Sequence, residues 1–191
     1  MERTPMPDTQ VEIYTPTARR LHWWTVALIL IQVPLGLYMA YRGNVQGIFD
    51  DLTNNLYSSH KLIGMIIFLV VLARLAYRLT HGAPADEPTL EAWHKGASHF
   101  NHWGLYLLLL ATPIAGYIGI SQYPALNIFG IPLPGIVAEN QEAASRTFLI
   151  HFYLALVLVA FVAIHVGAAL YHYVIRKDNV VTRMLPSLRR P

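Results

Sequence analysis

Four long apolar segments constrain this chain more than any other feature. A helix needs about 20 mostly apolar residues to cross the hydrocarbon layer of a bilayer. Segments that meet this length are residues 21–41, 60–79, 102–121 and 148–175. Hydrophobic residues make up 54% of the chain and charged residues only 13%, about half the charged share of soluble domains. We therefore predict an all-α fold, an integral membrane four-helix bundle.

The rest of the chain is too short to form a second domain. We predict one transmembrane domain over residues 15–186, a mobile cytoplasmic tail over residues 1–14 and a basic cytoplasmic tail over residues 187–191. Pro16 suits the first turn of a helix, where its missing N–H is harmless. The first twenty residues contain neither the apolar core nor the cleavage site of a secretory signal, so we expect no such signal here.

The basic residues predict the orientation. An even number of spans puts both termini on one side of the membrane. Three basic residues fall on the opposite side, namely Arg42, Lys61 and Arg146. The other eleven of the 14 fall on the terminal side: Arg3, Arg19, Arg20, Arg74, Arg78, Lys95, Arg176, Lys177, Arg183, Arg189 and Arg190. By the positive-inside rule both termini are then cytoplasmic.

The absence of cysteine narrows the chemistry. It excludes disulfides, cysteine-ligated iron–sulfur clusters, zinc fingers and covalently attached c-type haem. Nine histidines remain as the abundant ligand type for a transition metal or haem iron. The net charge of +3 is modest, and no nucleic-acid partner is expected.

The spacing of the intramembrane histidines predicts two ligand pairs. His151 and His165 are 14 residues apart, within roughly 40° of four full helical turns and roughly 21 Å apart in rise. One helix therefore presents two imidazoles on one face at two depths. The first segment begins on the cytoplasmic side with His22, which therefore lies at the depth of His165. The second segment begins on the opposite side with His60, which therefore lies at the depth of His151. Two bis-imidazole haems need this arrangement, and two axial ligands favour electron transfer over oxygen chemistry.

Other interpretations of the histidines remain. A metal-free explanation needs four unrelated histidine contacts to fall into this pattern by coincidence. Zinc prefers ligands clustered at one depth, whereas these are spread over two. His102 also enters from the cytoplasmic side and competes with His22 for the same iron. We favour His22 because it stands in an Arg-Leu-His-Trp motif.

Supporting residues are less specific. Arg74 and Arg78, at the cytoplasmic end of the second span, either pair with haem propionates or extend to lipid headgroups, and we favour the propionate role for Arg74. Several glycines within the spans can let a flat macrocycle approach a helix or serve close helix packing. They are Gly36, Gly64, Gly104, Gly116, Gly119 and Gly167.

The motifs resemble those of the bacterial cytochrome b561 family, which shares its fold with the cytochrome b subunits of nickel–iron hydrogenases and formate dehydrogenases. The resemblance covers residues 14–186. It rests on the segment from Tyr14 to the His22-Trp pair, His60-Lys-Leu-Ile-Gly64, His99-Phe-Asn-His102, the two histidines of the fourth span, and the ending from His172 through Lys177-Asp178-Asn179. It implies a bacterial inner-membrane protein with one haem b on His22 and His165 and another on His60 and His151.

The chain is most similar to the short, stand-alone members, which include superoxide oxidases. That resemblance implies that electrons pass from periplasmic superoxide to membrane ubiquinone. It makes His102 and His172 candidates for a cytoplasmic quinone pocket. The loop over residues 123–146 is of its own sequence and departs from the family pattern.

Three functions remain open from the sequence. The first is a superoxide:ubiquinone oxidoreductase, for which Lys61 is the best candidate to attract the anion, with Arg42 and Arg146 as alternatives. Carboxylates on the same side oppose that field, namely Asp50, Asp51, Glu139 and Glu142. The second is a membrane anchor and electron relay for a separate dehydrogenase such as a hydrogenase. The third is a structural membrane protein with incidental histidines.

Overall fold

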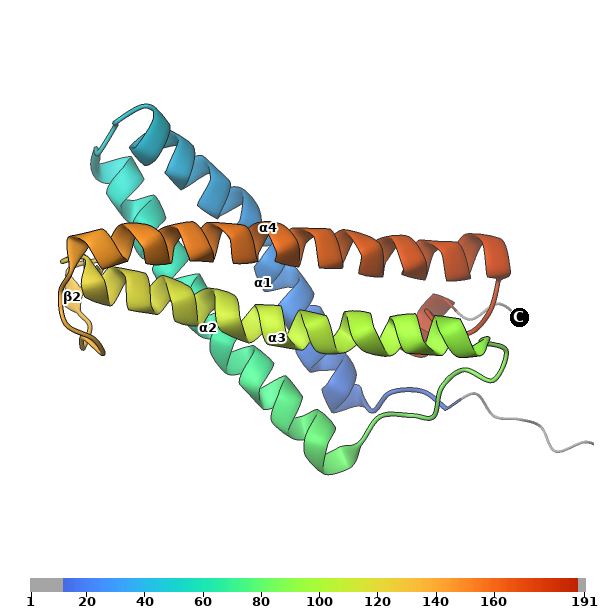
Figure 1. The fold of residues 1–191 in the computed structure, drawn as a ribbon. Helices are drawn as coiled ribbons and strands as arrows, with labels where there is room; N and C mark the ends of the chain where they lie inside the picture. The colour runs from blue at the N-terminus through green and yellow to red at the C-terminus, as the bar shows by residue number, and fades with distance from the viewer. Residues whose placement is uncertain (1–11, 189–191) are drawn as a thin grey trace, which may run out of the picture.

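The computed structural model describes residues 12–188 and is built from four long helices (Figure 1). The helices are α1 Pro16–Ala40, α2 Asp51–His81, α3 Ala92–Gln122 and α4 Gln141–Tyr171. One π-helical turn extends α1 (η1, Tyr41–Val45) and another extends α4 (η2, His172–Arg176); η3, Pro186–Leu188, is a 3-10 turn. β1 (Asn127–Ile128) and β2 (Ile131–Pro132) form a small antiparallel hairpin between α3 and α4. All four helices are long and apolar enough to cross a membrane, which confirms the predicted bundle.

Three helices begin well before their apolar segments. α2 starts nine residues ahead of His60, and α3 starts ten residues ahead of His102. The physical reason is that the bilayer requires only a minimum apolar length, so polar residues can extend a helix beyond the hydrocarbon layer. Side chains cap the starts of α2 and α4, whereas Glu91 at the start of α3 forms no side-chain cap. The Asp50 carboxylate accepts a hydrogen bond from the Thr53 N–H at 2.9 Å, and this cap supports a polar first turn in α2. His60 and His102 therefore lie inside their helices, not at their starts as predicted.

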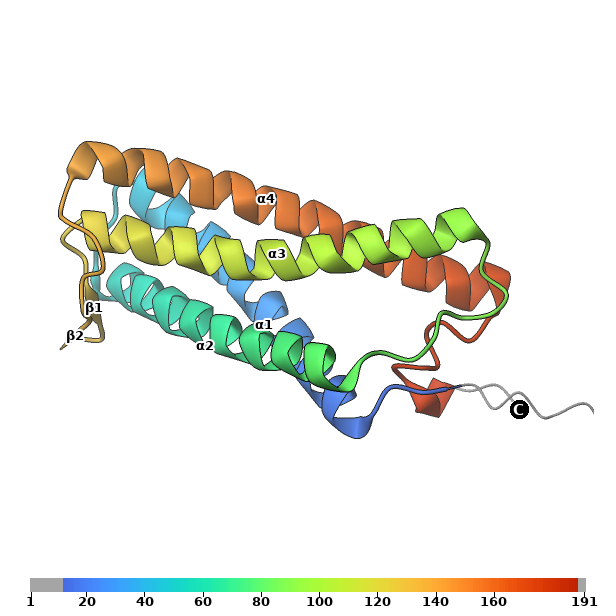
Figure 2. The ribbon, with the colours of Figure 1, turned by 60° about the horizontal axis from the view of Figure 1, so that its bottom comes forward.

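The helices form two hairpins that cross (Figure 1). Close packing joins α1 to α2, α2 to α3 and α3 to α4, and Figure 2 shows α2 running beside α3. One end of the bundle carries the first and last described residues, Glu12 and Leu188, together with the α2–α3 loop, and we call it the terminal end. The opposite end carries the turn over residues 46–50 and the β1–β2 hairpin, and we call it the hairpin end. Each helix thus spans the full distance between the two ends.

The core is small and lies between α2, α3 and α4. Its buried apolar side chains are Ile67, Val71, Tyr106, Leu108, Leu109 and Leu158. Most other leucines, isoleucines and valines of the helices are exposed, as expected for side chains that face lipid.

The terminal end is tied together by Arg183. Its Nε donates to the Glu12 carbonyl at 2.8 Å, and its Nη2 donates to the Ala85 carbonyl at 2.5 Å. The Tyr14 N–H donates to the Arg183 carbonyl at 3.2 Å. The N-terminal segment, the α2–α3 loop and the C-terminal segment are therefore held to one another. Of the predicted tails over residues 1–14 and 187–191, only residues 12–14 and 187–188 are among the described residues.

The hairpin end is tied down by Lys61 and Ser58. Lys61 Nζ donates to the Ala125 carbonyl at 3.1 Å and to the Asn127 carbonyl. The Phe129 N–H donates to Ser58 Oγ at 3.2 Å. These bonds dock the loop between α3 and α4 onto α2.

The turn between α1 and α2 is held by Asp50, which accepts from Arg42 at 2.6 Å. Hydrogen bonds from the Thr53 N–H and hydroxyl, followed by the Arg42 guanidinium, lower the pKa of Asp50 from 3.8 to about 2. The cap is therefore ionised at neutral pH.

Candidate functional site

The two histidines of α4 each face a histidine from the other hairpin. The ring centroids of His60 and His151 are 6.1 Å apart, with an interplanar angle of 85°. Those of His22 and His165 are 6.2 Å apart, with an angle of 62°. The structure thus brings together both pairs that the spacing suggested, one towards the hairpin end and one towards the terminal end.

These separations suit a metal held between two imidazoles. A metal–imidazole nitrogen bond is about 2.0–2.1 Å, so two rings aligned across one metal have centroids roughly 6.3 Å apart. Both pairs agree with this value. His102 lies 5.3 Å from His165, which is too short for a metal in line between the two rings. The geometry therefore fits His22 better than His102 as the partner of His165.

The nitrogen chemistry supports ligation as well. His151 Nδ1 lies 2.8 Å from the Thr112 carbonyl, and because a carbonyl only accepts, Nδ1 carries the proton. The lone pair of His151 is then on Nε2, in the tautomer that a backbone carbonyl imposes on metal-binding histidines. Nδ1 of His22 and Nδ1 of His60 are buried with no hydrogen-bond partner among the described residues. Purely structural histidines would be expected to satisfy such atoms.

Two glycines make room for the imidazoles of the hairpin-end pair. A Cβ at Gly36 would lie 2.9 Å from His60 Cε1, and a Cβ at Gly116 would lie 3.1 Å from His151 Cε1. Gly104 and Gly119 instead receive the rings of phenylalanines from α4. These four glycines therefore accommodate aromatic side chains. Among residues 12–188, no neighbouring atom lies within 4 Å of the Cβ position at Gly167.

We expect Gly36→Ala to disturb the hairpin-end pair. The added methyl group must displace the His60 ring, while alanine itself favours the helix by about 1 kcal/mol over glycine, so a loss cannot come from helix propensity. The measurement is haem content and the reduced absorbance spectrum of the purified variant. Gly167→Ala is the matched control, since its methyl group meets open space. A Gly36→Ala protein with the haem content and spectrum of the unmodified chain would contradict this role.

Arg74 and Arg78 are cations without an ion-pair partner among the described residues. Arg74 Cζ lies 5.2 Å from the ring centroid of Tyr106, and Arg78 Cζ lies 5.7 Å from that of Trp103. Both arginines line a small cavity of about 20 Å³ at the terminal end, beside Tyr77. A guanidinium in this position can pair with an anionic group of a ligand bound between α1 and α4.

His102 and His172 have different surroundings. His102 Nδ1 lies 3.2 Å from Ser98 Oγ, and its ring faces His165. His172 is buried, and its Nδ1 lies 2.6 Å from Asp178 Oδ2. Within the described part of the chain, no contact joins His102 to His172. His102 therefore lies beside the terminal-end pair of His22 and His165, whereas His172 lies at the start of the C-terminal segment.

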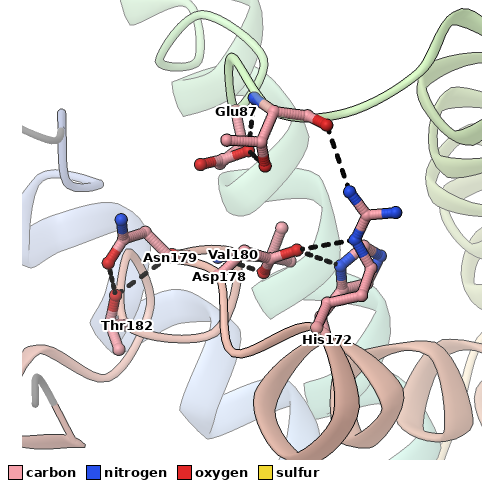
Figure 3. A network of polar contacts seen from close by, with 8 residues as sticks. Glu87, His172, Asp178, Asn179, Val180 and Thr182 are labelled. Carbon is pink, nitrogen blue, oxygen red and sulfur yellow. Dashed lines mark hydrogen bonds and ion pairs between the residues drawn. The ribbon is translucent and has the colours of Figure 1, made fainter.

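A polar network holds His172 in place (Figure 3). Asp178 Oδ2 also accepts from Arg176 Nε at 3.2 Å, and Arg176 Nη2 donates to the Thr89 carbonyl at 3.1 Å. The ring of His94 lies 5.9 Å from that of His172. No role for Asp178 or His94 is predicted by the sequence pattern. The Lys-Asp-Asn motif draws attention to Asp178 but does not indicate that Asp178 contacts His172.

The three basic residues of the hairpin end differ in their partners. Arg42 pairs with Asp50, and Arg146 pairs with Glu142. Lys61 donates to two backbone carbonyls and has no carboxylate partner among residues 12–188. Its positive charge is therefore the least neutralised of the three.

Four membrane-spanning helices with histidine pairs at two levels are the features of a membrane electron-transfer cytochrome. The family model for prokaryotic cytochrome b561 matches residues 13–187, and the chain belongs to that family. Membership implies haem b binding, which the histidine geometry fits.

Curated relatives agree with this assignment. Cytochrome b561 homolog 2 of Escherichia coli (strain K12) is 28% identical over 91% of this chain and 92% of its own length. Cytochrome b561 homolog 1 of the same organism is 28% identical over 91% of this chain and 97% of its own. The probable superoxide oxidase CybB of Yersinia pestis is 31% identical over 68% of this chain and 74% of its own.

Proposed function

We propose that the chain is a dihaem b oxidoreductase of the bacterial inner membrane that oxidises superoxide and reduces ubiquinone. The observation that carries this proposal is the presence of two histidine pairs at two levels of α4, each with the separation that one iron requires. The similarity to a probable superoxide oxidase supports the choice of donor. Two superoxide anions yield two dioxygen molecules and two electrons, and ubiquinone takes up those electrons with two protons to form ubiquinol.

The pairs indicate which residues would hold each haem. His22 and His165 would hold one haem b, and His60 and His151 would hold the other. Haem b held by two imidazoles would supply reversible one-electron transfer. We expect Arg74 to pair with a propionate of the terminal-end haem, because its guanidinium lies against Tyr106 and has no carboxylate partner among the described residues.

Lys61 is the residue that we expect to attract superoxide. It follows His60 directly in α2, at the hairpin end, and its charge is not neutralised by a carboxylate. A fixed cation near an electron entry site raises the local concentration of a small anion.

The protons for ubiquinone are expected to come from the terminal end. The contact of its Nδ1 with Asp178 orients the His172 ring, and we expect His172 to relay protons to the quinone. His102 lies beside His165, where it can do the same close to the terminal-end haem. Most basic residues lie at this end, which supports a cytoplasmic location for both termini.

The direct test is superoxide-driven reduction of ubiquinone by the purified chain alone. We expect Lys61→Gln to slow reduction of the protein by superoxide by about threefold to tenfold at low salt, and less at high salt, where steering is screened. Arg146→Gln is the matched control, because Arg146 is exposed and already paired with Glu142.

An unreactive protein would point to a different donor. If superoxide reduces neither haem, the chain is better explained as an electron relay and membrane anchor for a separate dehydrogenase. If reduction proceeds but Lys61→Gln matches Arg146→Gln at every salt concentration, Lys61 does not attract the donor.

A further inference from the structure

A cleft of about 590 Å³ opens between the first two turns of α1 and the C-terminal segment. Arg19, Arg20, Trp23 and Trp24 form its α1 side, and residues 184–187 form the other. The Trp23 indole N–H reaches the Met184 carbonyl at 3.5 Å, which links the two walls. The volume is within the range of small-molecule sites, about 300–1,000 Å³.

The charge of the cleft is positive and unbalanced. No carboxylate lies among its lining residues, and neither Arg19 nor Arg20 has an ion-pair partner in the part of the chain that the structure describes. Arg19 Nε is buried and makes no hydrogen bond within residues 12–188. A buried guanidinium nitrogen without an acceptor is costly, so a ligand that supplies anionic oxygens would be stabilised here.

The position of the cleft is that of a membrane interface. α1 is a membrane-spanning helix, and the arginines lie in its first turn with the tryptophans one turn further in. Tryptophan is enriched where lipid headgroups meet the hydrocarbon layer. Below the cleft, Trp24, Ile31 and Tyr38 follow at intervals of seven residues, on one face of α1, and all three are exposed. They form an apolar track that leads from the cleft into the membrane.

We propose that this cleft binds the headgroup of an anionic phospholipid. The phosphate oxygens accept hydrogen bonds from Arg19 and Arg20, and the acyl chains lie along the track of Trp24, Ile31 and Tyr38. A zwitterionic lipid fits less well, because none of the described residues that line the cleft carries a carboxylate to pair with its ammonium group. Phosphatidylglycerol carries the required charge and has no ammonium group.

The site is separate from the proposed electron-transfer reaction. The lining residues do not include any of the four axial histidines. If superoxide does not reduce the protein, the proposed lipid site is unaffected. If the protein does not bind the lipid, the assignment of the haem ligands is unaffected.

Binding can be measured on the purified, haem-loaded protein by native mass spectrometry. The probes are dihexanoyl phosphatidylglycerol, dihexanoyl phosphatidylcholine and inorganic phosphate. We expect one tightly bound phosphatidylglycerol per chain. We expect Arg19→Gln/Arg20→Gln to weaken its binding by on the order of tenfold or more, since each basic residue near an anionic lipid contributes several-fold. Arg146→Gln, at the opposite end of the bundle, should bind as the unmodified protein does.

Folding of the variants is checked separately. Arg20 is exposed, so Arg20→Gln alone should keep the haem spectrum and still lose about threefold to fivefold in affinity. Equal binding of phosphatidylcholine and phosphatidylglycerol would overturn the proposal. So would unchanged binding in the double variant. Displacement by millimolar inorganic phosphate would show a site for free phosphate, and displacement by a short-chain ubiquinone would show a quinone site. Either result would overturn the assignment of the cleft to a phospholipid.

Discussion

We expect replacement of His165 by Ala to remove one haem b from the protein, and replacement of His151 by Ala to remove the other. Each histidine of α4 faces its own partner, His22 at 6.2 Å and His60 at 6.1 Å between ring centroids. Loss of one axial imidazole should release its haem while the other pair stays intact, because the two pairs are roughly 21 Å apart along the helix.

The measurement is a pyridine haemochrome assay on purified variants. We expect close to two haems per unmodified chain, close to one in each single variant and none in the double variant. Acidified solvent should extract both haems, because the chain has no cysteine to hold them covalently. His81→Ala is the control, since His81 is exposed and stacks on Tyr77. One haem in the unmodified chain would contradict the two-site assignment.

His22→Ala should lose the terminal-end haem, whereas His102→Ala should keep both. The two histidines compete for the place opposite His165, and only His22 stands at the separation of two rings across a metal. His102 is also within 3.2 Å of Ser98 Oγ, a contact that a structural or proton-carrying histidine can use. The same haem assay decides the matter, together with the low-spin spectrum of the retained haem. The reverse pattern would assign the iron to His102.

The number, order and direction of the helices could be predicted because each is a continuous apolar segment of bilayer length. The pairing of His60 with His151 and of His22 with His165 could be anticipated because 14 residues return a helix nearly to the same face. In both cases the fixed rise and turn per residue of an α-helix connect sequence position to location in the membrane.

The helix starts and the polar contacts could not be predicted in the same way. Capping by Asp50 extends α2 through polar residues, and hydropathy does not detect this. The contact of His172 with Asp178 depends on the π-helical end of α4 and on Lys177, whose positive φ of 55° turns the chain back. Likewise, Lys61 reaches the loop carbonyls only because α2 and α3 are neighbours in the bundle. Such contacts depend on how the helices and loops are arranged in the tertiary structure, and local sequence patterns do not indicate that arrangement.

The crossing of the two hairpins has a consequence for assembly. Close backbone packing follows the chain, from α1 to α2, from α2 to α3 and from α3 to α4, and the His22–His165 pair brings α1 and α4 into contact. Both proposed iron sites take one ligand from each hairpin. The free energy of haem ligation would therefore help to hold the two hairpins together, in the way that metal binding is coupled to folding. Haem would then be a structural cross-link as well as a carrier, acting in addition to the apolar core that α2 shares with α3 and α4. We expect proteases to cut the haem-free chain faster than the haem-loaded chain.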